Sequence, residues 1–238
     1  MQEYSYEIHL HTKETSRCGH IAAADITKMY HDLGYSGIAV TDHLHETYIS
    51  SLDCKDNWES CVSEYLKGYK AAKAEGEKLG LDVILGLEIR FEPSLNDYLI
   101  YGVDEEFLLN NPYLYRSTIK DFYEKYTDRL LIIQAHPFRD LNETVSANYL
   151  HGVEIVNANP RHDSHDEMAF SLAKEMPSLL RTCSSDTHRI GEEGRAAVIF
   201  PKRIADSYDL KSAIESRNYK LKSIVHPEII KESGLGAL

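Results

Sequence analysis

The sequence predicts an α/β fold of the barrel type, and three observations predict it. The chain has 238 residues, a length that suits one barrel domain spanning 1–238. Short apolar runs alternate with stretches of helical period, as successive β-strand and α-helix units do. Six of the runs end in a residue that can ligate a metal. The carboxyl ends of the parallel strands in such a barrel lie on one face, so these residues would meet there.

The six runs have the length of strands and are mostly apolar before their last positions. They span residues 7–11, 38–43, 83–88, 131–136, 153–157 and 182–188. A further strand over 98–103 would pair with the strand that ends at Glu88, through a turn at Pro93 and Ser94. Two late runs, 196–200 and 221–225, would complete the barrel.

Helices are predicted between the runs, where apolar residues recur three and four positions apart. The first helix spans 22–33 and would end at Gly34, and a longer one spans 57–79 and would end at Gly80. Three more are expected over 113–125, 166–175 and 205–215. The tail after Pro227 is predicted to be a surface segment.

Composition and charge narrow the classes of function. The formal net charge of −12 disfavours attraction to nucleic acid or to anionic lipid. The first residues lack the basic and apolar regions of a signal peptide, and no apolar run is long enough to span a membrane. The four cysteines form no CxxC pair and are predicted to be reduced thiols. A soluble cytoplasmic protein is therefore expected.

The ligand-type residues have a geometry that suits metal binding. In a β-strand, residues i and i+2 face the same way. His9 and His11 therefore point together, and Asp186 and His188 do so if their strand continues. Imidazole suits Zn, Fe, Ni or Cu, and carboxylates extend the range to Mn and Mg. About five histidines with two carboxylates exceed what one four-coordinate ion needs. Two or three divalent ions are expected, with Glu88 or Asp186 as the bridge.

Other polar positions near the strand ends are predicted to support the site without binding metal. Asp42 would orient a ligand or cap the following turn. Glu154 and Asn157 are three apart in one strand run, so they would not share a face, and Asn157 is the better supporting residue. His162 and His165 lie on a loop at the same end of the barrel and would shape the pocket.

Five segments resemble, in order, the motifs of the PHP (polymerase and histidinol phosphatase) superfamily. They are His-Leu-His-Thr at 9–12, Thr-Asp-His at 41–43, Gly-Leu-Glu at 86–88, Ala-His-Pro-Phe-Arg at 135–139 and Ser-Asp-Thr-His-Arg at 185–189. The resemblance covers most of the chain. It implies a distorted (β/α)7 TIM-like barrel with a trinuclear metal centre of Zn, Mn or Fe, and hydrolysis of phosphoesters by an enzyme of the histidinol-phosphatase kind.

The resemblance also implies three sets of metal ligands. They are His9, His11, Glu88 and Asp186 for one ion, Glu88 and His136 for a second, and His20, His43 and His188 for a third. Cys18 competes with His20 for a place in the third set. Where many members carry a further histidine, this chain has Asp104, which would be either a replacement oxygen ligand or the start of a surface helix.

The chemistry expected from this resemblance is attack on the phosphorus of a small phosphomonoester. A hydroxide that bridges two ions is the nucleophile, because metal coordination lowers the pKa of water toward ~7. Asp186 and His45 are the candidate catalytic residues for proton transfer. Arginine forks bind phosphate, and four arginines on loops are expected to do so: Arg139, Arg189, Arg161 and Arg195. A small phosphorylated metabolite is the expected partner.

Two alternatives compete with a phosphatase. One is a phosphodiesterase, nucleotide exonuclease or amidohydrolase that uses the same barrel. The other is a catalytically silent module that binds metal or a phospholigand. The acidic net charge favours a small substrate over DNA.

Overall fold

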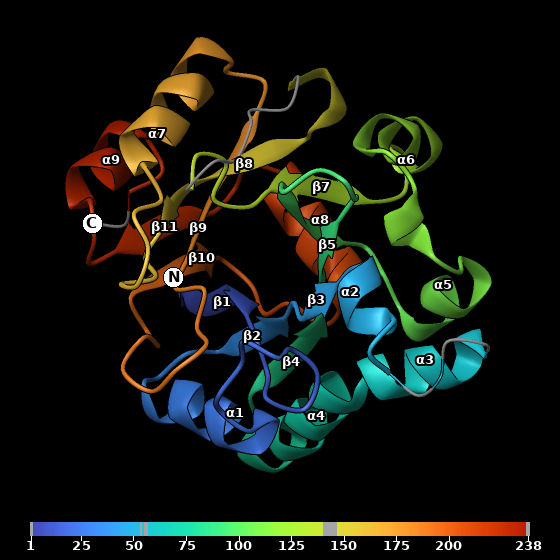
Figure 1. Ribbon diagram of the computed structural model, residues 1–238. Coiled ribbons are helices and arrows are strands. Elements are labelled where there is room, and N and C mark those ends of the chain that lie inside the picture. Colours follow the sequence, from blue (N-terminus) through green and yellow to red (C-terminus); the bar gives the residue numbers. More distant parts are fainter. Residues whose placement is uncertain (1, 53, 55–56, 140–146, 237–238) are drawn as a thin grey trace.

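The structure is a computed structural model that describes residues 2–52, 54, 57–139 and 147–236. Figure 1 shows the strands gathered toward the middle of the molecule and most helices around them. The first sheet has the strand order β11 (Lys220–Ser223), β10 (Ala196–Phe200), β1 (Tyr4–Leu10), β2 (Gly37–Val40), β4 (Asp82–Leu85). The second has the order β3 (His43–Leu44), β5 (Leu87–Arg90), β6 (Asp97–Tyr101), β7 (Leu131–Gln134), β8 (Gly152–Asn157), β9 (Leu180–Ser184).

The two sheets are joined in two places. Strand β2 leads into β3 after Thr41 and Asp42, and β4 leads into β5 across Gly86. At the other side, Leu10 forms a parallel bridge with Thr187, just after β9. The α/β class predicted from the sequence is confirmed. Because the described strands fall into two sheets, closure into a seven-stranded barrel stays an expectation.

Most strands run parallel, so their carboxyl ends lie at one edge. The pairs β1–β2, β2–β4, β3–β5, β7–β8 and β8–β9 are all parallel. The extra strand predicted after Glu88 is present as β6, and it is antiparallel to β5 and to β7. The start of β6 at Asp97 therefore lies beside the carboxyl end of β5, and the end of β6 lies at the opposite edge.

The predicted helices are present, but two of them are divided where the sequence pattern predicted one. Helix α1 (Ala23–Asp32) ends before Gly34, which has φ +80°. The predicted helix over 57–79 is two helices, α3 (Trp58–Tyr65) and α4 (Lys67–Leu79), separated at the buried Leu66. Helix α4 ends at Gly80, which is left-handed as expected.

Gly68 lets the start of α4 lie directly on the loop that follows β1. A Cβ atom at this position would lie 1.9 Å from Oγ1 of Thr12 and 2.8 Å from Oδ2 of Asp42. No side chain fits in that space, so only glycine permits this approach.

The remaining helices cover the outside of the sheets and follow the prediction closely. Helix α7 (Asp166–Glu175) has the predicted bounds, and α8 (Ser207–Glu215) begins two residues later than predicted. The predicted helix over 113–125 is a short 3-10 turn, η1 (Leu114–Arg116), followed by α6 (Ile119–Tyr126). The others are α2 (Glu46–Ile49), α5 (Glu105–Asn110), η2 (Ala147–Tyr149) and α9 (Pro227–Glu232).

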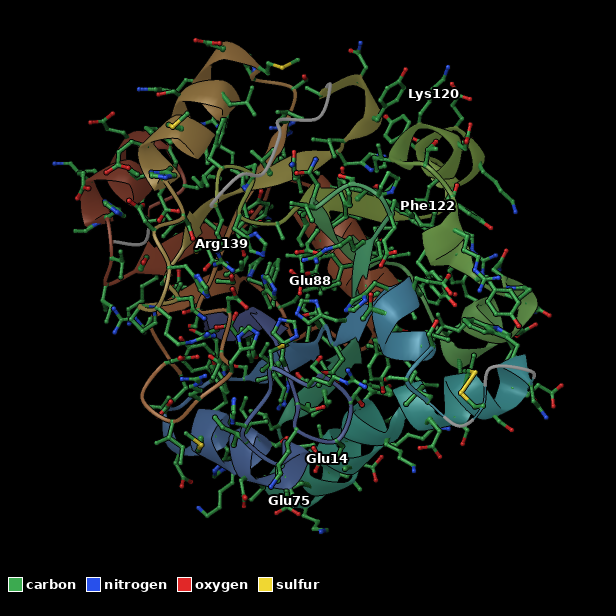
Figure 2. The ribbon with its side chains drawn as sticks, in the orientation of Figure 1. Glu14, Glu75, Glu88, Lys120, Phe122 and Arg139 are labelled. Carbon is green, nitrogen blue, oxygen red and sulfur yellow. A yellow bond between two sulfur atoms is a disulfide. The ribbon has the colours of Figure 1, made fainter. Side chains whose placement is uncertain are left out.

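The prediction that all four cysteines are free thiols is wrong for two of them. Cys54 and Cys61 form a disulfide, which Figure 2 shows as a yellow bond. The N–H of Asn57 donates to the carbonyl of Cys54, and the Cα atoms of the two cysteines lie 5.1 Å apart. Cys18 and Cys183 are free. Because two of the four cysteines are oxidised, the cysteines no longer support the prediction of a cytoplasmic location.

Within the described part of the chain, no helix combines the length and apolar character needed to cross a bilayer.

Candidate metal centre

Two imidazoles and two carboxylates converge from the carboxyl ends of β1 and β9 and from β5. Nε2 of His9 lies 3.3 Å from Oε1 of Glu88 and 3.4 Å from Oδ1 of Asp186. Nε2 of His11 lies 3.2 Å from Oε2 of Glu88 and 3.3 Å from Oδ1 of Asp186. All four side chains are almost fully buried. Figure 2 places Glu88 near the middle of the molecule, with the strand ends around it.

His9, His11 and Glu88 form one group of possible metal ligands, and His9, His136 and Asp186 form another. An ion with tetrahedral bonds of about 2.1 Å holds neighbouring ligand atoms about 3.4 Å apart. The measured separations of 3.2 to 3.4 Å match that spacing. Nε2 of His9, Nε2 of His11, Oε2 of Glu88 and Oδ1 of Asp186 are buried and have no hydrogen-bond partner. Buried polar atoms are normally paired, so this set of orphaned ligand atoms indicates a cation site.

Two of the possible ligands, each just after a strand, have uncommon backbone conformations. His136, after β7, has φ +29°, and Asp186, after β9, has φ +50°. Such values cost energy for residues other than glycine and are frequent at functional sites. Nε2 of His136 lies 3.1 Å from Oε1 of Glu88, and His136 also groups with His9 and Asp186 as possible ligands. The structure therefore brings together the residues predicted for the first two ions.

The charges in the cluster depend strongly on one another. Burial opposes a charge on His9, but Asp186 and Glu88 hold the pKa of its imidazole well above its ordinary value. Burial and His43 oppose a charge on His11, yet the same two carboxylates raise its pKa to about 9. Burial disfavours ionised Glu88, but His43 and His9 hold its pKa well below its ordinary range. Protons and divalent cations would thus compete for this anionic pocket.

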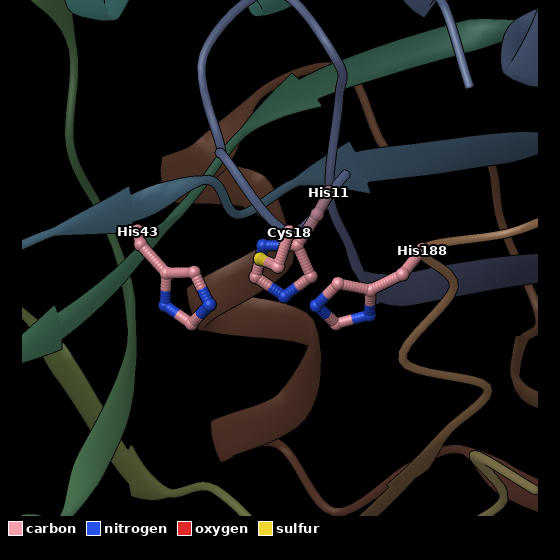
Figure 3. Close-up of side chains that lie close together, drawn as sticks. All are labelled: His11, Cys18, His43 and His188. Atoms are coloured by element: carbon pink, nitrogen blue, oxygen red, sulfur yellow. The ribbon is translucent and has the colours of Figure 1, made fainter. Parts of the chain in front are cut away.

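A third group of possible ligands contains Cys18 in addition to His11, His43 and His188. Figure 3 shows His43 and His188 on opposite sides, with Cys18 and His11 between them. Burial disfavours the thiolate of Cys18, but hydrogen bonds from His188 and His43 lower its pKa to about 5. His20, the residue carried over from the family motif, is exposed and outside these groups. It contributes only its backbone N–H, which donates to the carbonyl of His188 at 2.8 Å.

Glu154 contacts two of the possible ligands directly, although Asn157 was expected to be the better supporting residue. Its Oε1 lies 3.2 Å from Nδ1 of His9, and its Oε2 accepts from the N–H of His136 at 3.0 Å and from Nδ2 of Asn157 at 2.8 Å. The register of β8 shifts between Glu154 and Val156, which inserts an extra residue. Simple alternation therefore fails here, and Glu154 and Asn157 reach the same side.

Asp42 organises the loop that follows β1, within the range of roles predicted for it. Its carboxylate accepts from the N–H of Thr12 at 2.7 Å, from the Thr12 hydroxyl at 2.6 Å and from the Ser16 hydroxyl at 2.7 Å. The Ser16 oxygen lies 3.3 Å from Nδ1 of His11 and accepts from the N–H of His43 at 3.0 Å. Asp42 thus positions two ligands through Ser16.

The structure assigns Asp104 to helix capping and brings Asp97 to the site instead. Oδ1 of Asp104 accepts from the N–H of Phe107 at 2.6 Å, so Asp104 begins α5. Asp97 groups with His43 and Glu88 as possible ligands, and it accepts a bidentate pair from Arg90 at 2.8 and 2.6 Å. The antiparallel direction of β6 explains the exchange, because only its first residue lies at the ligand edge.

A cavity of about 390 Å³ opens over the ligand groups, a size within the range of small-molecule sites. It is lined by Cys18, His43, Glu88, Arg90, Leu95, Asp97, His136, Arg139, Arg161, His162, Asp186 and His188. Arg90 was missed, although it lies two residues after Glu88 and strand alternation would have placed both on one face.

The four arginines predicted to bind phosphate differ in their surroundings. Arg139 and Arg161 line the cavity. Both are already engaged. Arg139 lies 2.9 Å from Oδ2 of Asp186 and donates to Oδ1 of Asn157 at 2.6 Å, and Nε of Arg161 donates to Oε1 of Glu192 at 2.6 Å. Arg195 lines a neighbouring cavity and donates to a backbone carbonyl. Arg189 is exposed. Phosphate binding stays a prediction for all four.

His45, a predicted catalytic residue, lies in an adjoining cavity of about 250 Å³ that shares Cys18, His43 and Arg90 with the main one. Its Nδ1 accepts from the N–H of Tyr48 at 3.2 Å. Burial and the nearby His43 lower its pKa to about 4. The imidazole is therefore neutral near pH 7, with its remaining proton on Nε2. Its catalytic role, like that of Asp186, stays a prediction.

Comparisons with known proteins find solved structures of similar fold. A two-domain protein from Bacteroides vulgatus that contains a predicted PHP-like metal-dependent phosphoesterase has a TM-score of 0.67 at 15% identity, over 97% of this chain and 68% of that one. PsfC from Pseudomonas syringae has a TM-score of 0.63 at 16% identity, over 98% and 97%. An amidohydrolase from Chromobacterium violaceum, solved with sulfate and without metal, has 0.52 at 14%, over 94% and 99%.

At these identities the solved structures establish a shared fold only. No curated protein matches the chain. The sequence model of the PHP domain family matches residues 7–216, which include the ligand residues of all the groups described above. The chain therefore belongs to the PHP domain family.

Proposed function

We propose that this protein hydrolyses a small phosphomonoester with the help of two or three divalent metal ions. The observation that carries the proposal is the set of orphaned ligand atoms of His9, His11, Glu88 and Asp186, of which Glu88 and Asp186 line a cavity. Bound ions would supply an activated water and neutralise the charge of a phosphoryl group. Zn, Mn and Fe all suit mixed imidazole and carboxylate ligands.

The chain's own residues would hold and orient the reactants. His9, His11, Glu88 and Asp186 would hold one ion, and Glu88 with His136 would hold a second. Glu154 keeps the Nδ1 proton of His9 in place, so Nε2 faces the cluster. Arg161 and Arg90 stand on the cavity wall, where a guanidinium can bind a phosphate oxygen.

The cavity favours a small substrate. Its volume of about 390 Å³ suits a phosphorylated metabolite, and the net charge of −12 disfavours a nucleic acid. The cytoplasmic location predicted from the sequence also stays a proposal, which cell fractionation would test.

The proposal is tested with the purified protein, stripped of metal and reloaded with Mn²⁺ or Zn²⁺. We expect hydrolysis of p-nitrophenyl phosphate that depends on the added ion. His9→Ala and Asp186→Ala should abolish it, whereas Asp104→Ala, which removes a helix cap and the acceptor of the Tyr208 hydroxyl, should not. Activity that survives in the His9→Ala and Asp186→Ala variants would come from a contaminant and would sink the proposal.

Amide hydrolysis is a second candidate, because one protein of the same fold is an amidohydrolase. A side-by-side assay of a phosphomonoester, a dinucleotide and a cyclic amide separates the candidates. Turnover of the amide or the dinucleotide alone would replace the phosphatase proposal. Bound metal without turnover of any of them would favour a binding module.

A further inference from the structure

We propose that Cys18, and not His20, is a metal ligand with His43 and His188, and that this thiolate-containing position takes Zn²⁺ ahead of Mn²⁺ or Mg²⁺. The inference rests on the metal centre proposed above. It decides between Cys18 and His20, which the resemblance to the family motif left as competitors.

The geometry of the group carries the inference. One ligand atom from each of His11, Cys18, His43 and His188 lies within 4.8 Å of the others. Tetrahedral zinc with one sulfur at about 2.3 Å and nitrogens at about 2.1 Å holds ligand atoms roughly 3.4–3.6 Å apart. The side chains therefore need only a small contraction around an ion. Figure 3 shows the sulfur between the rings of His43 and His188.

The loop after β1 explains why residue 18 faces the site and residue 20 does not. The N–H of Ser16 donates to the carbonyl of Thr12 at 2.9 Å, and the N–H of Gly19 donates to the carbonyl of Ser16 at 2.9 Å. A Cβ atom on Gly19 would lie 2.6 Å from the carbonyl oxygen of Thr12, so the chain doubles back tightly at a glycine. This return turns Cys18 toward the cavity and leaves His20 exposed.

His11 belongs to two groups of possible ligands. If it binds the ion of the first group, an ion beside Cys18 has three protein ligands and one free coordination position. Nε2 of His11 already faces Glu88 and Asp186, and its Nδ1 lies 3.3 Å from the Ser16 hydroxyl. An ion at this group would then be held by Cys18, His43 and His188, all of which line the cavity. Three protein ligands with one open place are typical of catalytic zinc, whereas structural zinc has four.

The chemistry of the donors favours different ions at different positions. Thiolate is a soft ligand that selects Zn²⁺ over Mn²⁺ and Mg²⁺. The position between His9, His11, Glu88 and Asp186 has two carboxylates and no sulfur, so it accepts harder ions. We therefore expect a centre in which the Cys18 position is the most selective for zinc.

Cobalt(II) reports directly on a thiolate ligand, because sulfur-to-cobalt charge transfer absorbs in the near ultraviolet. The apo protein is titrated with Co²⁺ without oxygen and without added thiols, so that Cys54 and Cys61 stay in their disulfide. The wild type should show the charge-transfer band. His20→Ala and Cys183→Ser, which alter the exposed histidine and the other free thiol, should keep it.

Cys18→Ser should lose the band. Elemental analysis should find one zinc ion fewer per chain, because the affinity for that ion should fall at least tenfold. Cys18→His, which keeps the number of ligands, should stay loaded without the band and covers the case in which the serine variant fails to fold. A band that persists in both Cys18 variants, or that disappears in His20→Ala, overturns the inference.

The failures of the two proposals are distinguishable. Cobalt d–d absorption without charge transfer in the wild type overturns the role of Cys18 and leaves the metal centre intact. A wild-type protein that binds no cobalt at all overturns both.

Discussion

Nδ1 of His9 lies 3.2 Å from Oε1 of Glu154, so the ring presents Nε2 to Glu88 and Asp186. Such an outer carboxylate fixes the tautomer of a ligating histidine. We expect Glu154→Gln to weaken metal binding about 10- to 100-fold. Competition with a chromogenic chelator measures the affinity, and circular dichroism checks the fold. An unchanged affinity would show that Glu154 has only a packing role.

Asp104 provides the opposite case, a carboxylate that is predicted to matter only for stability. Asp104→Ala removes the cap of α5 and the acceptor of the Tyr208 hydroxyl. We expect the free energy of unfolding to fall by about 1 kcal/mol, with metal content unchanged. Urea denaturation and elemental analysis test this. A loss of bound metal in this variant would restore Asp104 as a candidate ligand.

Arg139 is expected to act on stability through Asp186. Arg139→Met keeps the bulk of the side chain but leaves the buried Asp186 without its guanidinium partner at 2.9 Å. Loss of one partner of a buried ion pair costs about 3–5 kcal/mol. A bound cation also neutralises Asp186, so the cost should be smaller with metal than with a chelator. Urea denaturation in both conditions measures it, and an equal cost in the two would contradict the prediction.

Asp166 should make stability depend on pH. Burial raises its pKa to about 7, and its Oδ1 accepts from the N–H of Asn157 at 3.1 Å. Between its unfolded pKa, about 4, and pH 7, the folded state holds a proton that the unfolded state has lost. Unfolding free energy therefore falls as pH rises through this window, by up to about 1.4 kcal/mol per unit.

Asp166→Asn removes this titration and keeps the accepting oxygen. Its stability relative to the wild type should therefore increase from pH 5 to pH 7.5, when both are denatured with urea in a constant excess of chelator. A difference between the two proteins that is the same at both pH values would show that Asp166 does not titrate there.

The features that the sequence predicts well depend on periodicity. His9 and His11 share a face because β1 is extended, and His136 and Asp186 lie at the edge because β7 and β9 run parallel to β8. Those arguments use only alternation and strand direction. They placed the first ligand group without any knowledge of loops.

The features that the sequence did not predict depend on local departures from regularity. The extra residue in β8 carries Glu154 to the ligand side, and the reversed direction of β6 exchanges Asp104 for Asp97. The sequence left Cys18 and His20 as competitors, and Cys18 is the one in the cluster because hydrogen bonds to Asp42 and the lack of space at Gly19 shape the loop. Such effects arise from tertiary contacts, and one sequence does not display them.

Gly68 is the point at which the outer helix α4 packs against the loop that follows β1. Any side chain there would lift α4 or press Thr12 away from Asp42, and the displaced loop would carry Cys18 with it. A position that touches no ligand can therefore set how fully an interior site is occupied. Changes in the outer helix layer would then alter the occupancy of the site gradually, whereas replacement of a ligand would act as an on–off change.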